Sequence, residues 1–350
     1  MIKAGGRLRM SPLRFIHESK TFPFDYISEA TTTVFNDEIW HVRLGEGGRV
    51  FIDELYDEYD PDQFPEVEVW SSTNGRDWRL RKTNPFPPRD GLKTLVHNGK
   101  LWVIGGFLYN TDVHHEYASR EVWNSKDGIN WRLVSSGSNV PFVELESAIV
   151  FNNKMFIFDA KEYLGESDDM AKIYSSIDGI NWTVEKSYGW DEAHIKNPIV
   201  FKNLMYGWRY SGYGTTFSRT LWKSFNGRVW KQVIPTPQKF LSADNLFPHR
   251  GGQSVVVHNE KVWVIGGRER NSVTGDYEYF NDIWYSEDMQ AWSRVSGESR
   301  LPSRHRSTAV DFRGKIWLFG GWTPSSTSFS DPMSDQVWSI TESRRLSLLD

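Results

Sequence analysis

The sequence contains no cysteine, which excludes disulfide bonds, thiolate metal sites and cysteine nucleophiles. It also lacks any run of the roughly 20 apolar residues that crossing a bilayer requires, and the first residues, Met1 to Met10, have no apolar signal segment. Acidic and basic residues nearly cancel, so the formal net charge of -4 shows no excess of the kind that nucleic-acid-binding proteins carry. P-loop, G-x-S-x-G and zinc-helix motifs are missing as well. We therefore expect a cytoplasmic protein that has no cofactor. We also expect it to bind neither membranes nor nucleic acid.

Aromatic residues are abundant instead, at 15% of the chain, and they include 17 tryptophans. In five pairs of aromatic residues, the two members of the pair are eight residues apart. In three of these pairs the turn between the members reads Ser-x-Asp-Gly or Ser-x-Asn-Gly. Asp-Gly and Asn-Gly favour tight hairpins because glycine accepts the positive φ that such turns need. Each pair therefore predicts a β-hairpin with an aromatic residue on both arms. The pairs are Trp70 and Trp78, Trp123 and Trp131, Tyr174 and Trp182, Trp222 and Trp230, and Trp284 and Trp292.

A second hairpin is predicted before each of these pairs. Its turns fall at residues 35–38, 97–100, 151–154, 201–204, 258–261 and 312–315. The strand after each turn carries an aromatic residue in register, namely Trp40, Trp102, Phe156, Tyr206, Trp263 and Trp317. Two hairpins give a four-stranded antiparallel sheet that recurs about every 50 residues, and such sheets must stack around an axis to bury both faces.

In three copies this second strand ends in a glycine pair, namely Gly105-Gly106, Gly266-Gly267 and Gly320-Gly321. Together with the aromatic residue and the downstream tryptophan, these pairs resemble the kelch repeat over nearly the whole chain. The resemblance implies an all-β fold, a single six-bladed β-propeller of four-stranded antiparallel blades spanning residues 1–350. Blades are expected near residues 28–81, 90–134, 145–185, 195–234, 251–295 and 305–340. For closing the last blade we favour a strand near 12–18 over one near 345–349, because a blade shared by both termini resists fraying.

Binding is expected on the face that carries the variable loops, since the tight turns of the other face are short and uniform. Arg89, Arg250 and Arg304 each follow a proline by two residues and stand eight residues before a first turn. We expect them to point toward one side of the central channel, with Arg268 and Arg306 near the same rim. Guanidinium groups donate paired hydrogen bonds, so this cluster predicts a carboxylate or phosphate site. In the alternative interpretation, each arginine bonds loop carbonyls or a local acid and stiffens the ring.

Trp190, Trp208 and Trp322 fall outside the repeat positions. They are predicted in or beside the variable loops, where they either stack on a sugar ring or peptide side chain or plug the channel mouth. Two further segments are interpreted as solvated: His114-His115-Glu116, which shows no third metal ligand, and the acidic insertion Asp53–Asp62, which lacks the spacing of a calcium loop. No metal site is predicted.

These features predict a non-catalytic module that recognises a carbohydrate or peptide ligand, with an anionic group as one option. The alternative is a sugar epimerase, because bacterial kelch-like N-acetylneuraminate epimerases have a similar overall form. That resemblance implies that arginines hold the sugar carboxylate, while acidic and histidine side chains transfer protons. The candidates for proton transfer are Glu144, Glu146, Asp191, His194 and His305.

A sialidase is disfavoured as a third interpretation. The turn with Ser125, Asp127, Gly128 and Trp131 is one residue tighter than the S-x-D-x-G-x-x-W box of that class, and no tyrosine nucleophile can be placed. The sequence leaves the oligomeric state open.

Overall fold

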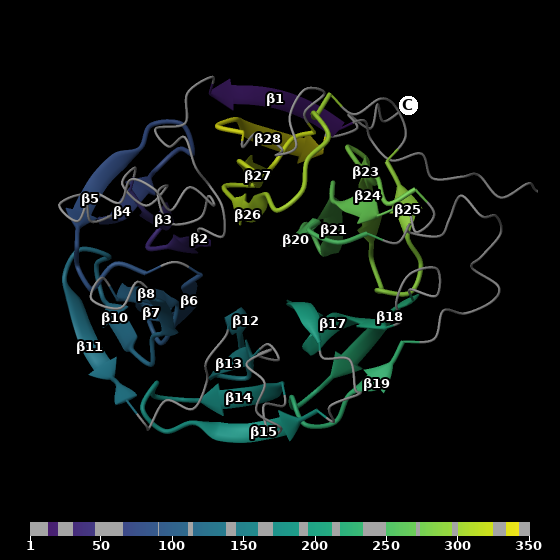
Figure 1. Cartoon of the computed structure of the whole chain (residues 1–350). Coiled ribbons are helices and arrows are strands. Elements are labelled where there is room, and N and C mark those ends of the chain that lie inside the picture. Colours follow the sequence, from purple (N-terminus) through teal and green to yellow (C-terminus); the bar gives the residue numbers. More distant parts are fainter. Residues whose placement is uncertain are drawn as a thin grey trace, which may run out of the picture.

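Six small sheets stand around a central axis in the computed structural model (Figure 1). Each is a four-stranded antiparallel sheet, which confirms the predicted six-bladed β-propeller. In the part of the chain that is described, no helix is long and apolar enough to cross a bilayer. The structure describes residues 13–19, 31–45, 66–89, 91–110, 115–137, 145–159, 171–188, 195–211, 218–233, 250–270, 274–295, 300–324 and 334–342.

The strands of the first three blades follow one another in chain order from the axis outward. Blade 1 contains β2 (Thr31–Phe35), β3 (Glu38–Leu44), β4 (Val67–Ser72) and β5 (Arg79–Thr83). Blade 2 contains β6 (Lys93–His97), β7 (Lys100–Ile104), β10 (Val122–Ser125) and β11 (Trp131–Ser135). Blade 3 contains β12 (Leu145–Phe151), β13 (Lys154–Asp159), β14 (Lys172–Ser176) and β15 (Thr183–Ser187).

Blades 4 and 5 repeat this order, and blade 6 is completed by the N-terminal strand. Blade 4 contains β16 (Lys196–Phe201), β17 (Leu204–Ser211), β18 (Ser218–Ser224) and β19 (Lys231–Gln232). Blade 5 contains β20 (Ser254–His258), β21 (Lys261–Ile265), β24 (Ile283–Ser286) and β25 (Ser293–Arg294). Blade 6 contains β26 (Thr308–Phe312), β27 (Lys315–Phe319), β28 (Val337–Glu342) and β1 (Leu13–Ser19).

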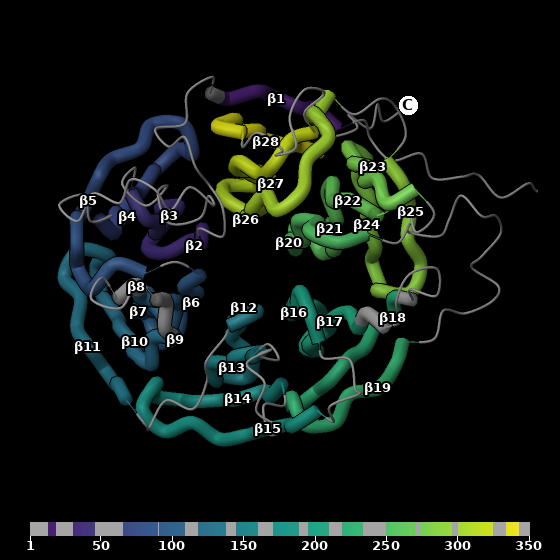
Figure 2. Tube along the Cα trace, in the orientation of Figure 1, coloured from purple at the N-terminus to yellow at the C-terminus, as the bar shows by residue number. Residues whose placement is uncertain are grey.

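The ring is closed by β1, which pairs antiparallel with β28 from Leu13 opposite Glu342 to Ser19 opposite Val337. In Figures 1 and 2 the purple N-terminal strand lies beside the yellow β28. The sequence has two candidate strands for closing the ring, and the N-terminal one is the strand that pairs with β28. The C-terminal segment 345–349, the acidic insertion 53–62 and His114 lie outside the described residues.

Two short hairpins extend blades 2 and 5 beyond their glycine pairs. One is formed by β8 (Phe107–Asn110) and β9 (His115–Ala118), and it places His115 and Glu116 in a strand, where the sequence predicts a loop. The other is formed by β22 (Arg268–Arg270) and β23 (Tyr277–Tyr279). Both connect the second strand of a blade to its third strand, so they lie on the loop-rich face.

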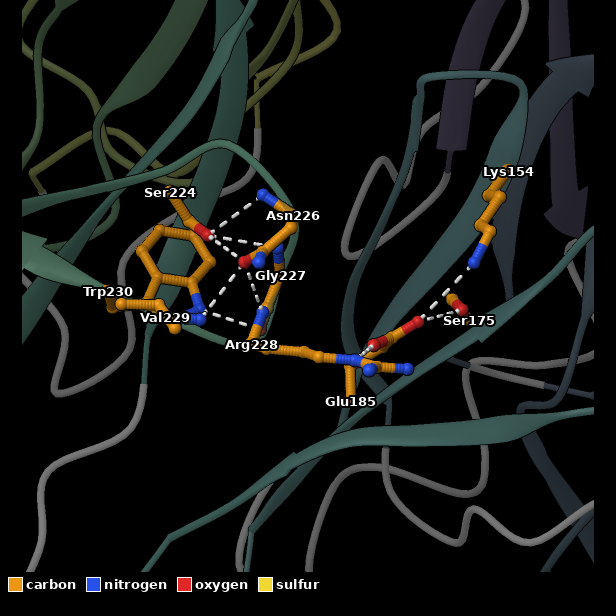
Figure 3. A network of polar contacts seen from close by, with 9 residues as sticks. All are labelled: Lys154, Ser175, Glu185, Ser224, Asn226, Gly227, Arg228, Val229 and Trp230. Carbon is orange, nitrogen blue, oxygen red and sulfur yellow. Dashed lines mark hydrogen bonds and ion pairs between the residues drawn. The ribbon is translucent and has the colours of Figure 1, made fainter.

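The two tight turns of a blade use different chemistry. In all six first turns two consecutive residues have positive φ, as in Asn98 and Gly99, which is typical of the type I′ hairpin turn. The second turns are held by side chains, as Figure 3 shows for blade 4. The Ser224 hydroxyl accepts hydrogen bonds from the amides of Asn226 and Gly227. The side-chain oxygen of Asn226 accepts hydrogen bonds from the amides of Arg228 and Val229. Blades 1, 2, 3 and 5 repeat this pattern.

The hydrophobic core lies between the blades. Buried apolar side chains of the described residues form six clusters, and each cluster joins one blade to the next. The indole of Trp102 on β7, for example, packs with Leu145 and Met155 of blade 3. Its Nε1 donates to the carbonyl of His97, 2.9 Å away, so the same side chain also fixes the first hairpin of its own blade.

At four of the six blade interfaces, a glycine in the second turn of the next blade lies on the aromatic ring of the second strand. A Cβ atom added to Gly179 of blade 3 would be 2.5 Å from Cζ3 of Trp102, which is closer than nonbonded carbon atoms approach. The same close approach relates Gly75 to Trp317, Gly128 to Trp40 and Gly227 to Phe156. Blade 5 has Met289 at this position, and it packs in one cluster with Tyr206 of blade 4.

A buried carboxylate adds a polar contact between blades 3 and 4 (Figure 3). Glu185 on β15 accepts a hydrogen bond from Ser175 Oγ at 2.6 Å and another from Arg228 Nε of the blade 4 turn. Lys154 Nζ lies 3.6 Å from the same carboxylate. Burial works to raise the pKa of Glu185, but the Ser175 hydroxyl and the two cations outweigh it and lower the pKa.

The same arrangement recurs where the ring closes. Glu18 on β1 accepts hydrogen bonds from Ser339 of blade 6 and, at 2.5 Å, from Arg76 Nε in the turn of blade 1. Lys315 Nζ lies 3.7 Å away, and the Glu18 side chain is only 2% exposed. The closing strand is therefore fastened both to its own blade and to the next one.

We predict that Gly179→Ala lowers the free energy of unfolding by about 1–3 kcal/mol more than Gly99→Ala does. Both glycines have positive φ, of 76° and 64°, so both variants bear the strain of a left-handed alanine. Only the Gly179 variant also pushes a methyl group into the Trp102 ring, since nothing lies within 4 Å of a Cβ at Gly99. Guanidinium chloride unfolding of both variants measures the difference, and equal losses would show that the contact between blades is unimportant.

Candidate functional site

Four of the residues predicted for the site, Glu144, Trp190, Asp191 and His194, lie outside the described residues. Trp208 does not lie in a loop. Strand β17 is long enough to include it, paired with Lys196 on one side and Leu221 on the other. Its side chain is 2% exposed and packs between blades 4 and 5 with Tyr206 and Val262. The expectation that Trp208 offers a stacking surface to a ligand is therefore wrong.

The three repeated arginines are buried inside their blades. In blade 2, Arg89 Nη1 lies 3.4 Å from the Gly105 carbonyl, and Nη2 donates to Glu121 Oε2 at 2.5 Å. Trp123 Nε1 donates to the same carboxylate oxygen, 2.9 Å away. Blades 5 and 6 repeat this set with Arg250, Gly266, Asp282 and Trp284, and with Arg304, Gly320, Gln336 and Trp338.

These contacts correct the expectation that Arg89, Arg250 and Arg304 point into the channel. Each residue is at most 1% exposed, and its guanidinium group turns outward to the carbonyl of the glycine pair and to the third strand. The structure therefore matches the alternative interpretation, in which they stiffen the ring. The sequence does contain the signal for it, because the partner always stands 32 residues after the arginine and two before a tryptophan.

Arg268 and Arg306 are held side by side on the rim of blades 5 and 6. Arg268 forms a two-way backbone bridge with Gly251, with both N–O distances at 2.9 Å. The residue after Gly251, Gly252, accepts a hydrogen bond at its carbonyl oxygen from the amide of Arg306, with an N–O distance of 2.6 Å. Two consecutive glycines at the entry to β20 thus position the backbones of both arginines. The Arg306 residue is exposed and Arg268 is half-buried.

Aromatic rings lie beside these two arginines. His305, which precedes Arg306, forms a bridge with Trp322 and stacks on its indole with ring centroids 6.4 Å apart. Tyr279 of β23 also contacts His305, and the centroids of the two rings are 5.7 Å apart. The next tyrosine along β23, Tyr277, lies under the guanidinium of Arg268 at 4.0 Å.

The sequence analysis identified Arg268, Arg306, His305 and Trp322, but it missed the two tyrosines. Their signal is the alternation in Arg268-Glu269-Arg270 and Tyr277-Glu278-Tyr279, because alternate residues of a strand share one face. We name this set the rim patch: Arg268, Arg270, Tyr277, Tyr279, His305, Arg306 and Trp322.

Glu146 is not part of the rim patch. It lies in β12 of blade 3, and its Oε2 is 3.4 Å from Nζ of Lys196 in blade 4. Blade 3 stands across the ring from blade 6, so Glu146 and His305 are on opposite sides of the axis (Figure 1). The structure therefore does not bring these two candidates for proton transfer together. Nor do three His, Asp or Glu side chains gather as metal ligands would within the described ranges.

The rim patch combines positive charge with flat apolar faces. Guanidinium groups bind carboxylates through charge-assisted hydrogen bonds, and aromatic faces stack on the C–H faces of sugar rings. The chain is thus a six-bladed β-propeller that carries arginine and aromatic side chains on its loop-rich face between blades 5 and 6.

No protein-family model matches the sequence. Among solved structures, that of the protein YjhT superposes on the chain with a TM-score of 0.62. The match covers 91% of this chain and 96% of YjhT at 14% sequence identity. At that identity the comparison establishes the shared propeller fold and nothing finer.

We predict that Gln336→Glu stabilises the protein at pH 7 by about 1 kcal/mol, because a hydrogen bond to a charged group is worth more than one to an amide. Arg304 faces an amide where Arg89 and Arg250 face carboxylates, and burial lowers the pKa of Arg304 to about 10. The new carboxyl would have its pKa lowered by Arg304. Its contribution is therefore present above the unfolded-state pKa of about 4.3 and is lost as the pH falls.

Chemical unfolding at pH 7 and at pH 4 measures this effect. A variant that is less stable than the parent at pH 7 would show that the cost of burying the carboxylate exceeds the gain from the ion pair.

Proposed function

We propose that the protein binds an acidic carbohydrate at the rim patch. The observation that supports this proposal is the placement of the exposed Arg306 next to the His305–Trp322 stack. A pyranose ring could lie on the half-buried indole while its carboxylate meets the guanidinium group. Arg89, Arg250 and Arg304 are buried, so the proposal rests on the exposed Arg306 and the half-buried Arg268.

The second candidate function is mutarotation of a sialic-acid-like sugar. Its support is architectural, since the kelch-type six-bladed ring is the form that the resemblance to N-acetylneuraminate epimerases implies, and the match to YjhT spans nearly both chains. Mutarotation needs only a modest acid and base. Of the described candidates for proton transfer, His305 belongs to the rim patch, whereas Glu146 is paired with Lys196 across the ring.

For binding, we predict that Arg306→Ala raises the Kd for N-acetylneuraminate and galacturonate about tenfold, the loss expected for one charge-assisted hydrogen bond. Isothermal titration calorimetry measures the change. Arg132→Ala, which removes an exposed arginine from the outer strand of blade 2, should leave the Kd unchanged. Equal affinity in the Arg306 variant and the parent, or no binding by the parent, would contradict the proposal.

For mutarotation, we predict that the protein accelerates the conversion of α-N-acetylneuraminate to the β-anomer and that His305→Gln slows it at least tenfold. Proton NMR follows the anomer ratio after the α-anomer is released in situ. If the parent protein gives the buffer rate while it still binds the sugar, the chain acts as a recognition module only.

A further inference from the structure

Four aromatic rings of the rim patch form one continuous ladder. Tyr277 and Tyr279 lie 6.3 Å apart along β23, and Tyr279 is followed by His305 at 5.7 Å and Trp322 at 6.4 Å. The ladder starts on the hairpin of blade 5 and crosses to blade 6. Its end at Tyr277 is the most open, with 43% of the residue exposed, whereas His305 in the middle is buried.

The positive charges follow the ladder on the same face of the hairpin. Arg268 pairs with Tyr279 and Arg270 pairs with Tyr277 in the β22–β23 register, so all four side chains share one face. The guanidinium carbon atoms of Arg268 and Arg270 are 4.0 and 6.0 Å from the Tyr277 ring. Glu269 and Glu278 form the intervening pair, which projects from the opposite face.

Each step of this ladder is about as long as one pyranose ring, so the full ladder is longer than a monosaccharide needs. We propose that the rim patch binds an extended acidic oligosaccharide, with one sugar on the Trp322 side and further sugars along Tyr279 and Tyr277. This inference rests on the proposed function and adds the length of the ligand. Arg306 serves the first carboxylate, and Arg268 and Arg270 serve the following ones.

A single-stranded nucleic acid is the other polymer that arginines and stacked rings could bind. Both polymers carry one negative charge per unit, so the charges of the hairpin do not separate them, and the titration below compares the two directly.

The test titrates the full-length protein with galacturonate and with oligogalacturonates of two, four and six residues. We expect the affinity to increase at least tenfold from the monosaccharide to the tetrasaccharide and then to level off. Tyr277→Ala should weaken tetrasaccharide binding about tenfold and monosaccharide binding much less, because its ring lies at the far end of the ladder. Phe225→Ala, which removes a 60% exposed ring from the opposite face, is the matched control and should change neither. Thermal unfolding of each variant verifies that the fold is intact.

The outcomes separate the two proposals. If mono- and tetrasaccharide bind equally well, or if Tyr277→Ala weakens both to the same extent, the extended site is wrong while the acidic-sugar site stands. Both proposals fail if the protein binds neither galacturonate nor any of its oligomers. They also fail if Arg306→Ala changes the affinity for none of these ligands. Tighter binding of a six-nucleotide oligouridylate than of the hexasaccharide would assign the ladder to nucleic acid and overturn the inference.

Discussion

The structure depends on the contact between an aromatic ring on the second strand of one blade and the bare backbone of a turn in the next blade. A blade has no core of its own, because its apolar side chains are buried only when a neighbour covers them. The aromatic ring is part of that contact, and the turn can approach it closely where a glycine lies at the point of contact. The indole N–H of Trp102 also donates to the carbonyl of His97. The same side chain therefore stabilises both the first hairpin of its own blade and the contact with the next blade. In blade 6 the third and fourth strands, β28 and β1, come from opposite ends of the chain, and there the Glu342 carboxylate accepts hydrogen bonds from Lys261 and Asn259 of blade 5.

A ring built in this way needs its blades to keep one shape, and the buried arginines provide that rigidity. Each connects the segment before the innermost strand to the end of the second strand and to the start of the third. Burying a guanidinium group is costly unless its donors find partners, and here the glycine carbonyls and the acids or amide accept hydrogen bonds from the Nη atoms. The arginine and the glycine pair belong together, since blades 2, 5 and 6 have both. In blade 4, Arg209 comes from the second strand and lies 4.0 Å over the Trp222 ring, so a cation on an aromatic face takes the place of the ion pair.

The parts of the fold that repeat were predictable from the sequence, because spacing and turn chemistry are local. The hairpins at Asn98-Gly99 and Asp127-Gly128 and the aromatic positions between them follow from period and turn residues alone. The direction of the arginines was not predictable in the same way. A proline-flanked arginine before an inner strand can face the axis or the sheet, and the choice depends on a partner 32 residues away. Trp208 was misplaced because its register was missed: it is the fifth residue of its strand, the position that Ile104 and Ile265 occupy directly before their glycine pairs. The tyrosine ladder required knowledge of the β22–β23 register, which a short connection between the second and third strands of one blade does not reveal.

Burial therefore divides one residue type into two roles on the same ring. Arg304 and Arg306 are separated by a single residue, yet the first is enclosed by Gly320 and Gln336 while the second is exposed beside the His305–Trp322 stack. Arg306 adopts a positive φ of 56°, and its amide donates to Gly252 of the neighbouring blade. This contact with blade 5 helps to hold the backbone of Arg306 in its left-handed conformation. The scaffold that buries one arginine thus leaves the next one exposed, and we expect a variant that loosens the blade 5–blade 6 interface to weaken the proposed binding without touching the rim patch.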